Sequence, residues 1–339
     1  MQTARRRPVA ELALSDRMAI PAAAAVTRMK ALDRLRLGDA VFRHLTRIAA
    51  IGVLLLLSGV IISLIQGSIP ALRTFGLGFL ISERWNPVTD VYGALPAIYG
   101  TIVTSMIAML IAVPVGLMIA FFLTELCPQW LRRPIGIAIE LLAGIPSIIY
   151  GIWGLFIFAP FLQATLQPFL INTLGNVPGI GSLFAGPPYG IGILTAALIL
   201  AIMVLPFVTS ISRDVFEAVP GVLKEAAYGV GCTRWEVVRN VVLPYARVGV
   251  IGGIMLGLGR ALGETMAVTF VIGNAHRISA SVLAPGTTIS ATIANEFTEA
   301  VGDLYTSALV ALGLILFVIT FIVLAAARYM LMRLERRIG

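Results

Sequence analysis

Residues 225–244 read EAAYGVGCTRWEVVRNVVLP and lie in a polar loop, 213–246, between two very hydrophobic segments. The loop predicts two short helices joined by a turn. Pro220 suits the first position of the first helix, and Gly231 suits its end, because glycine accepts the left-handed conformation that helix ends often need. The sequence TRWE at 233–236 matches a capping box, which indicates the start of the second helix.

The first of these helices is amphipathic, with Lys224 and Glu225 beside its apolar face. That face is formed by Leu223, Ala226, Ala227 and Val230. The second helix should end at Leu243-Pro244, just before the next hydrophobic segment. On this pattern alone, the loop is either an amphipathic element lying on a membrane surface or a docking surface for another protein.

The chain as a whole is too hydrophobic for a soluble protein. Hydrophobic residues make up 58% and charged residues 12%, and the mean hydropathy is +0.95. A helix needs about 20 mainly apolar residues to cross a bilayer, and the runs in this chain are too long and continuous for barrel strands. We therefore predict an all-α integral membrane protein with six transmembrane helices, near 47–66, 97–123, 135–161, 189–212, 247–273 and 304–327.

The basic residues indicate the orientation in the membrane. If the N-terminus is cytoplasmic, 21 of the 25 Lys and Arg residues lie on the cytoplasmic side and three outside, which fits the positive-inside rule. Both termini are then cytoplasmic, with a poorly ordered tail at 1–46, the loop at 213–246 and a basic tail at 328–339. The net charge of +8 reflects contact with anionic lipid and not with nucleic acid.

The sequence lacks the patterns of a catalytic chain. Neither of its two lysines, Lys30 and Lys224, stands in a phosphate-binding P-loop sequence. No arrangement of a nucleophile with a base is evident. Cys127 and Cys232 are both expected on the reducing cytoplasmic side, so no disulfide is predicted. We predict no catalytic residue, no metal and no cofactor, so that any ATP hydrolysis takes place on a partner chain.

Three ionisable residues, Glu140, Arg260 and Glu264, fall within predicted membrane helices. Such residues are costly in lipid and normally face the interior of a helix bundle. Arg260 lies roughly 18 Å along its helix from Val248, which places it near the middle of the bilayer. Arg260 and Glu264 are spaced i,i+4, so we expect them to share a face and to pair. The pair either locks helix packing, or Arg260 binds a passing oxyanion and Glu264 compensates its charge when the pathway is empty.

Small residues continue the faces on which these charges lie. One face holds Gly253, Gly257, Arg260 and Glu264. A second face holds Glu140, Gly144, Ser147, Gly151 and Gly154. A third face, without a charged residue, holds Thr101, Ser105, Ala108 and Ala112. Pro146 interrupts the backbone hydrogen bonds of the helix that carries the second face, which leaves backbone groups that need partners. The faces should meet inside the bundle, which predicts a substrate pathway that includes Arg260, Glu264, Glu140 and Ser147.

The loop resembles the EAA loop of ABC importer permeases, whose pattern is E-A-A-x-x-x-G-x9-I-x-L-P. Val241 stands where that pattern has Ile, and every other spacing is kept. In that family the loop contains a coupling helix that sits in a cleft of the ATP-binding subunit. The resemblance therefore implies that the coupling contact is made by Glu225, Ala226, Ala227, Gly231, Leu243 and Pro244.

Three further strings resemble the PstC-type permease of the phosphate-specific ABC importer. They are GALPAIYGTIVTS (93–105), LLAGIPSIIYGIWG (141–154) and GLGRALGETMAVTFVIGN (257–274). The resemblance implies a type I ABC importer permease of the bacterial inner membrane that translocates inorganic phosphate. It also implies as partners a PstA-type permease, two ATP-binding subunits on the loop and an extracytoplasmic phosphate-binding protein.

The alternatives differ in what drives transport and in what is carried. Within the same family, another oxyanion such as sulfate or molybdate is the nearest rival. A secondary transporter or channel would carry a mid-membrane Arg–Glu pair without a motor. A scaffold or signalling subunit would use the loop for docking and show no transport.

Overall fold

The described part of the chain, residues 22–335 of the computed structural model, is helical, with one isolated β-bridge between Asn86 and Val91. The predicted all-α class is therefore confirmed. The chain divides into two compact units, Met1–Ser63 and Leu64–Gly339, which are described separately. Parts of the predicted tails, 1–21 and 336–339, lie outside the described residues.

Six helical stretches among the described residues are long and apolar enough to cross a membrane, which confirms the predicted number. They are Val41–Phe75, Leu95–Leu126, Ser147–Leu174, Ile193–Glu217, Arg234–Gly263 and Asp303–Arg333.

The first and last helices are longer than their apolar runs. α2 (Ala22–Phe75) begins well before the predicted start at 47, so residues 22–46 of the predicted tail are helical. This part is rich in Ala, Leu and Arg, which are strong helix formers even without an apolar surface to bury. α15 (Asp303–Glu335) likewise continues through part of the predicted basic tail.

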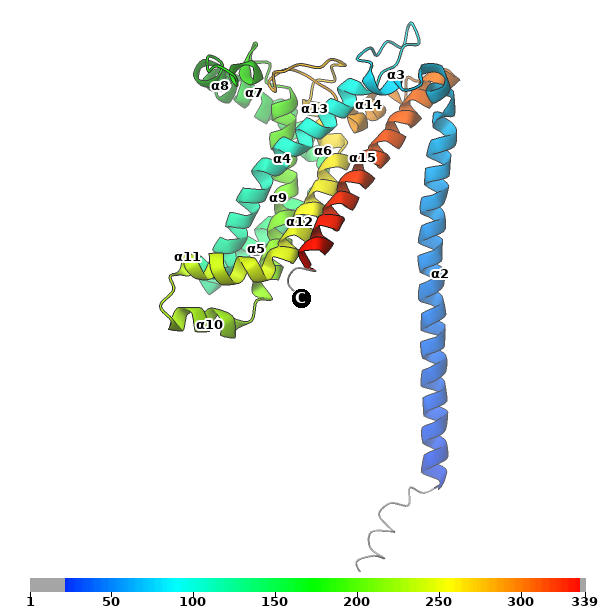
Figure 1. The fold of residues 1–339 in the computed structure, drawn as a ribbon, viewed down its shortest axis with the longest axis vertical. Coiled ribbons are helices and arrows are strands. Elements are labelled where there is room, and N and C mark those ends of the chain that lie inside the picture. Colours follow the sequence, from blue (N-terminus) through cyan, green and yellow to red (C-terminus); the bar gives the residue numbers. More distant parts are fainter. Residues whose placement is uncertain (1–21, 336–339) are drawn as a thin grey trace, which may run out of the picture. The chain divides into compact units, whose positions relative to one another are not determined.

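The second unit is built around α9 (Ile193–Glu217), its most buried membrane helix. α4 (Leu95–Phe121) and α12 (Leu243–Gly263) pack against α9 (Figure 1). Their approach is close because glycines lie at the contacts. A Cβ atom on Gly253 of α12 would lie 2.9 Å from Ile211, and one on Gly257 would lie 3.0 Å from Val204. The small-residue face predicted for this helix therefore packs on α9.

The predicted helix 135–161 is interrupted at Pro146. α5 (Gln129–Gly144) ends before this proline, and α6 (Ser147–Trp153) begins after it. Pro146 has no N–H to donate to the carbonyl of Leu142, four residues earlier. The hydroxyl of Tyr150 donates to that carbonyl at 2.9 Å and replaces the missing bond.

The predicted helix 247–273 is interrupted as well. α12 ends at Gly263, and a separate short helix, α13 (Met266–Val271), follows. α13 packs on α6. At this contact a Cβ atom on Gly151 would lie 2.7 Å from the Phe270 ring and 3.1 Å from the Ala267 Cα atom. The two interrupted segments thus meet through their second halves.

Short elements cover both ends of the second unit. α10 (Gly221–Gly229) and α11 (Arg234–Val237) lie at one end, here called the α10 end. The opposite end, here called the α14 end, carries four short helices (Figure 1). These are α3 (Gly78–Ile81), α7 (Ala159–Ala164), α8 (Leu166–Leu174) and α14 (Ile289–Glu296).

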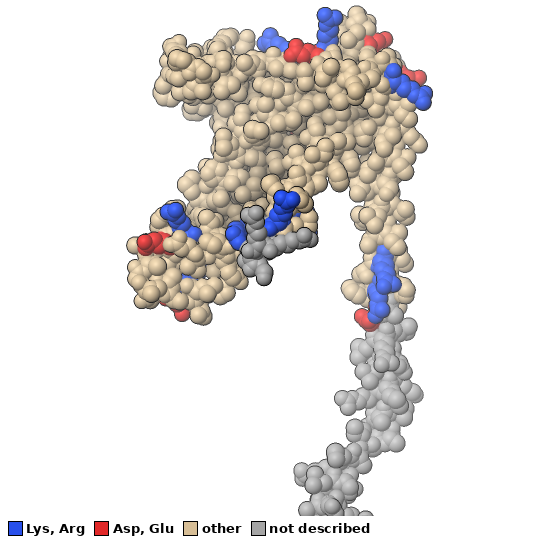
Figure 2. Space-filling view, in the orientation of Figure 1, with Lys and Arg blue, Asp and Glu red and all other residues tan. Residues whose placement is uncertain are grey.

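On the face drawn in Figure 2, the charged side chains of the second unit gather at these two ends. On this face, the flank between the ends is free of Lys, Arg, Asp and Glu. An apolar band between two charged ends is the surface that a lipid bilayer requires.

A polar cluster ties several segments together at the α14 end. The Glu296 carboxylate accepts hydrogen bonds from the indole N–H of Trp85, at 2.6 Å, and from the hydroxyl of Tyr305, and it contacts His276 Nε2 at 2.9 Å. The Trp85 and His276 rings stack, with centroids 5.3 Å apart. Burial raises the pKa of the Glu296 carboxyl, but the three hydrogen-bonding partners together outweigh burial and leave its pKa lowered.

Candidate functional site

Arg260 lies in the last turn of α12 and faces an aromatic ring of α9. Its guanidinium carbon lies 4.6 Å from the centroid of the Phe207 ring. Its Nε atom is buried and has no hydrogen-bond partner, and none of the ion pairs formed among the described residues includes Arg260. A contact with a ring face stabilises the cation but uses none of the N–H donors. Arg260 therefore retains donors for an anion.

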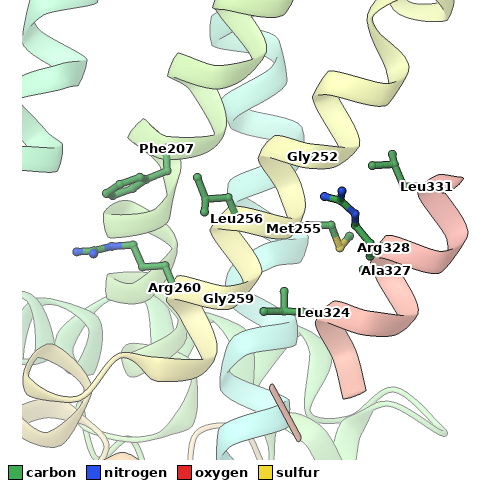
Figure 3. A pocket seen from close by; sticks show the side chains of 10 residues that line it. All are labelled: Phe207, Gly252, Met255, Leu256, Gly259, Arg260, Leu324, Ala327, Arg328 and Leu331. Atoms are coloured by element: carbon green, nitrogen blue, oxygen red, sulfur yellow. The ribbon is translucent and has the colours of Figure 1, made fainter. Parts of the chain in front are cut away.

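A groove of about 490 Å³ is lined by residues of α9, α12 and α15, and Figure 3 shows the Arg260 side chain beside Phe207, on the side of α12 away from Arg328. Arg260 and Arg328 are the charged residues of its lining, which contains no acidic side chain. The remaining lining residues are glycine or apolar: Phe207, Gly252, Met255, Leu256, Gly259, Leu324, Ala327 and Leu331. Two arginines and no carboxylate in one lining favour a negatively charged occupant, because opposite charges attract.

The predicted helical pair of Arg260 and Glu264 is wrong. The i,i+4 rule applies within a continuous helix, and α12 ends at Gly263, where Glu264 takes an extended conformation with ψ of 132°. The Glu264 carboxylate instead accepts a bond from the backbone N–H of Ala267, at 3.5 Å, in the first turn of α13. Glu264 thus caps the second half of the interrupted segment.

Glu140 lies at the α10 end, and not in the lining of the Arg260 groove. Its Oε1 atom accepts a hydrogen bond of 2.9 Å from Arg213. Arg213 lies near the end of α9. Because α5 ends at Gly144, the predicted face that runs from Glu140 to Gly154 is broken at its second residue. Sequence reasoning missed Arg213, whose position directly after the apolar run of α9 was the available signal.

Ser147 is half-buried at the first position of α6. It lies one turn before Gly151, at the contact of α6 with α13, and it does not line the Arg260 groove. The structure therefore brings none of the other predicted pathway residues into the lining that contains Arg260.

The loop has the local structure that its sequence predicts around Gly231, whereas Pro220 is the N-cap of α10 and not its first residue. Gly231 adopts a φ of 91°, and the N–H of Cys232 donates to the carbonyl of Ala227 at 3.1 Å, closing the end of α10. Thr233 and Glu236 form both bonds of the capping box that starts α11.

The apolar face of α10 is largely uncovered, and α10 has no buried residue. Ala227 is half-buried against a core cluster, whereas Glu225 and Ala226 are exposed. Large apolar side chains are exposed beside them on α10 and at the start of α11: Val222, Leu223, Tyr228, Val230 and Trp235. An apolar patch of this kind is typical of a surface that another protein covers.

Leu243-Pro244 does not end a helix, contrary to the prediction. A π-helical turn (Val238–Val242) leads from α11 directly into α12, where Pro244 lies in the first turn. The missing N–H of proline costs little at this position, and the wider turn accommodates its ring. The loop and the membrane segment are therefore one continuous helical stretch, Arg234–Gly263.

Residues 112–336 match the family described as the binding-protein-dependent transport system inner membrane component. The chain belongs to this family. The six apolar helices among its described residues and the family description make it a multi-pass protein of the inner membrane.

This transport-system component also has relatives that match it along most of its length. It is 70% identical over 313 residues to the phosphate transport system permease protein PstC of Mesorhizobium japonicum, covering 92% of this chain and 96% of the relative. It is 57% identical over 301 residues to that of Pasteurella multocida, covering 89% and 94%. The PstC-type resemblance identified in the sequence is therefore confirmed.

Solved transporters share the fold. The structure of a bacterial alginate ABC transporter, in complex with alginate pentasaccharide-bound periplasmic protein, has a TM-score of 0.56 and 16% identity, covering 93% of this chain and 96% of that chain. An inward-facing MetNI methionine ABC transporter has a TM-score of 0.55 and 15% identity, covering 74% and 99%. The predicted type I ABC importer permease fold is confirmed.

Proposed function

We propose that this chain is the permease subunit of an ATP-driven importer that translocates inorganic phosphate across the inner membrane. The observation that carries the proposal is the 70% identity, over 92% of the chain, to a phosphate transport system permease protein.

The chemistry around Arg260 suits a phosphate ion. A guanidinium presents a planar set of N–H donors that matches two oxyanion oxygens at once. Phe207 holds the guanidinium through its ring face, and no carboxylate in the groove lining competes for the donors. Because Glu264 caps α13, it supports the position of the interrupted segment and does not neutralise Arg260 directly.

The energy for transport would come from partner chains. The exposed α10 surface around Glu225 would dock on an ATP-binding subunit, with two such subunits in the complex. A homologous PstA-type permease would complete the pathway, and an extracytoplasmic binding protein would deliver phosphate. In this arrangement the α10 end is cytoplasmic, as the distribution of basic residues predicts.

The test is radiolabelled phosphate uptake into proteoliposomes that contain the complete transporter, with ATP inside and the binding protein outside. We compare the wild type with Arg260→Gln and with an ATPase-inactive motor. Arg333→Gln is a matched control, because Arg333 also lies over a ring, at 4.7 Å from the centroid of Tyr329, but does not line the groove.

We expect sulfate-resistant uptake that is lost with the inactive motor. Arg260→Gln should lower uptake about 10- to 150-fold, since a hydrogen bond to a charged group is worth about 1.5–3 kcal/mol, and Arg333→Gln should not. Uptake that survives the inactive motor would contradict ATP-driven import. Competition by sulfate would identify another oxyanion as the cargo, and equal losses in the two arginine variants would contradict the role of Arg260.

A further inference from the structure

One ion pair fastens the loop helix α10 to the membrane helices. Lys224 Nζ lies 2.6 Å from Glu125 Oε1, in the π-helical turn (Phe122–Leu126) that follows α4. The side chains are 19% and 9% exposed, which makes this the least exposed ion pair among those of the described residues. An ion pair shielded from water is screened little by salt and holds its geometry better than an exposed one.

Lys224 and its neighbour Glu225 point to different sides of α10. Consecutive helical residues point about 100° apart, and Glu225 is exposed while Lys224 reaches inward. The residue available to a docking partner is thus bonded directly, through the backbone, to the residue that contacts the membrane helices.

The ion pair lies where two membrane helices are joined. Lys224 Nζ is also 3.5 Å from the carbonyl oxygen of Phe216, near the end of α9. The Phe216 ring stacks on that of Phe121, the last residue of α4, with centroids 4.3 Å apart. A displacement of Lys224 therefore acts on α4 and α9 together.

The rest of α10 offers little else to carry a force to these helices. It has no buried residue, and its half-buried Ala227 contributes only a methyl group to the core beneath it. We propose that Lys224 is a positioning residue that transmits movement of α10 to α4 and α9 through its ion pair with Glu125. This inference rests on the proposed function, because it assigns the path by which a partner ATPase moves the permease.

The experiment measures phosphate uptake and ATP hydrolysis in the same proteoliposomes of the complete transporter. The variants are Lys224→Met, Glu125→Gln, their combination, and the conservative Lys224→Arg. Asp39→Asn is the matched control, because it removes a carboxylate from an ion pair with Arg43 whose side chains are 67% and 60% exposed. Recovery of the ATPase subunits on the purified permease is measured for every variant.

We expect Lys224→Met and Glu125→Gln each to lower the phosphate moved per ATP hydrolysed about fivefold or more, a typical coupling between distant sites, with the ATPase subunits still bound. The combined variant should be no worse than either single one, and Lys224→Arg and Asp39→Asn should keep the wild-type ratio. An unchanged ratio in the single variants would overturn the inference, and so would a loss of uptake fully explained by lost ATPase subunits. A wild type without ATP-dependent phosphate uptake would instead contradict the proposed function itself.

Discussion

Gly231 allows a direct test of how the loop is held in shape. Its φ of 91° is a conformation that costs a residue with a Cβ atom roughly 1–2 kcal/mol. No atom lies within 4 Å of the position that a Cβ would occupy, so Gly231→Ala introduces a penalty from the backbone alone. The bonds at stake are those donated by the N–H groups of Gly231, to Tyr228 at 2.9 Å, and of Cys232, to Ala227 at 3.1 Å.

A penalty of this size corresponds to about a 5- to 30-fold change in the population of the open turn. We therefore expect hydrogen exchange at the Gly231 and Cys232 amides to accelerate by about that factor in the bilayer-embedded permease. Gly229→Ala is the control, because Gly229 ends α10 without a positive φ and also has open space around it. Alanine there should slow exchange slightly, since it favours the helix. Equal acceleration in both variants, or none in Gly231→Ala, would refute the backbone argument.

Three further predictions concern other parts of the second unit. Gly151→Ala should destabilise the protein by about 1–3 kcal/mol, because the new methyl group would overlap Phe270; thermal unfolding should show this loss, while Gly144→Ala, which has open space, should lack it. Thr233→Ala removes the side chain that completes the capping box and should cost about 1 kcal/mol, measured as faster exchange in α11, with Thr233→Ser as the rescue. The pKa of Glu296 is lowered in the fold, so its stabilising contribution should be complete above the ordinary value of 4.5 and lost as the pH falls through the lower folded value. The unfolding temperature, measured as a function of pH, should therefore fall at acid pH, and Glu296→Gln should make this fall less steep. An equally steep fall in the variant would show that other groups cause it.

Local rules predicted the turn at Gly231 and the capping box well because their structure is set by neighbouring residues. The turn at Gly231 needs only a residue that tolerates a positive φ, and the capping box needs only Thr233 and Glu236 three positions apart. The number of membrane helices could also be predicted from the sequence, because the bilayer sets a minimum length for each apolar run.

The interruptions of the membrane helices were harder to predict. Pro146 signalled the first, but the replacement of its missing bond by Tyr150 depends on how the chain folds back. At Gly263 no proline marks the break, so the sequence favoured one helix and a false pair of Arg260 with Glu264. Pro244 misled in the opposite sense, because a π-helical turn carries the chain past it.

Contacts between distant segments left no periodic signal at all. Lys224 and Glu125 are 99 positions apart, and Glu140 and Arg213 are 73 apart. Each residue alone resembles an ordinary charged residue at the end of a membrane segment. Such pairs become visible only when the helices that carry them are packed together.

The continuous helical stretch from Arg234 to Gly263 has a mechanical consequence. At 1.5 Å per residue, roughly 40 Å separates Arg234 from Arg260, which makes the stretch a lever with one end in the loop and the other beside Phe207. A tilt of about 5° about the loop end would shift Arg260 by roughly 3 Å, the full length of a hydrogen bond. A small tilt of this stretch would therefore suffice to make or break every bond between this arginine and an anion, and it would at the same time shift the close contact of Gly257 with Val204.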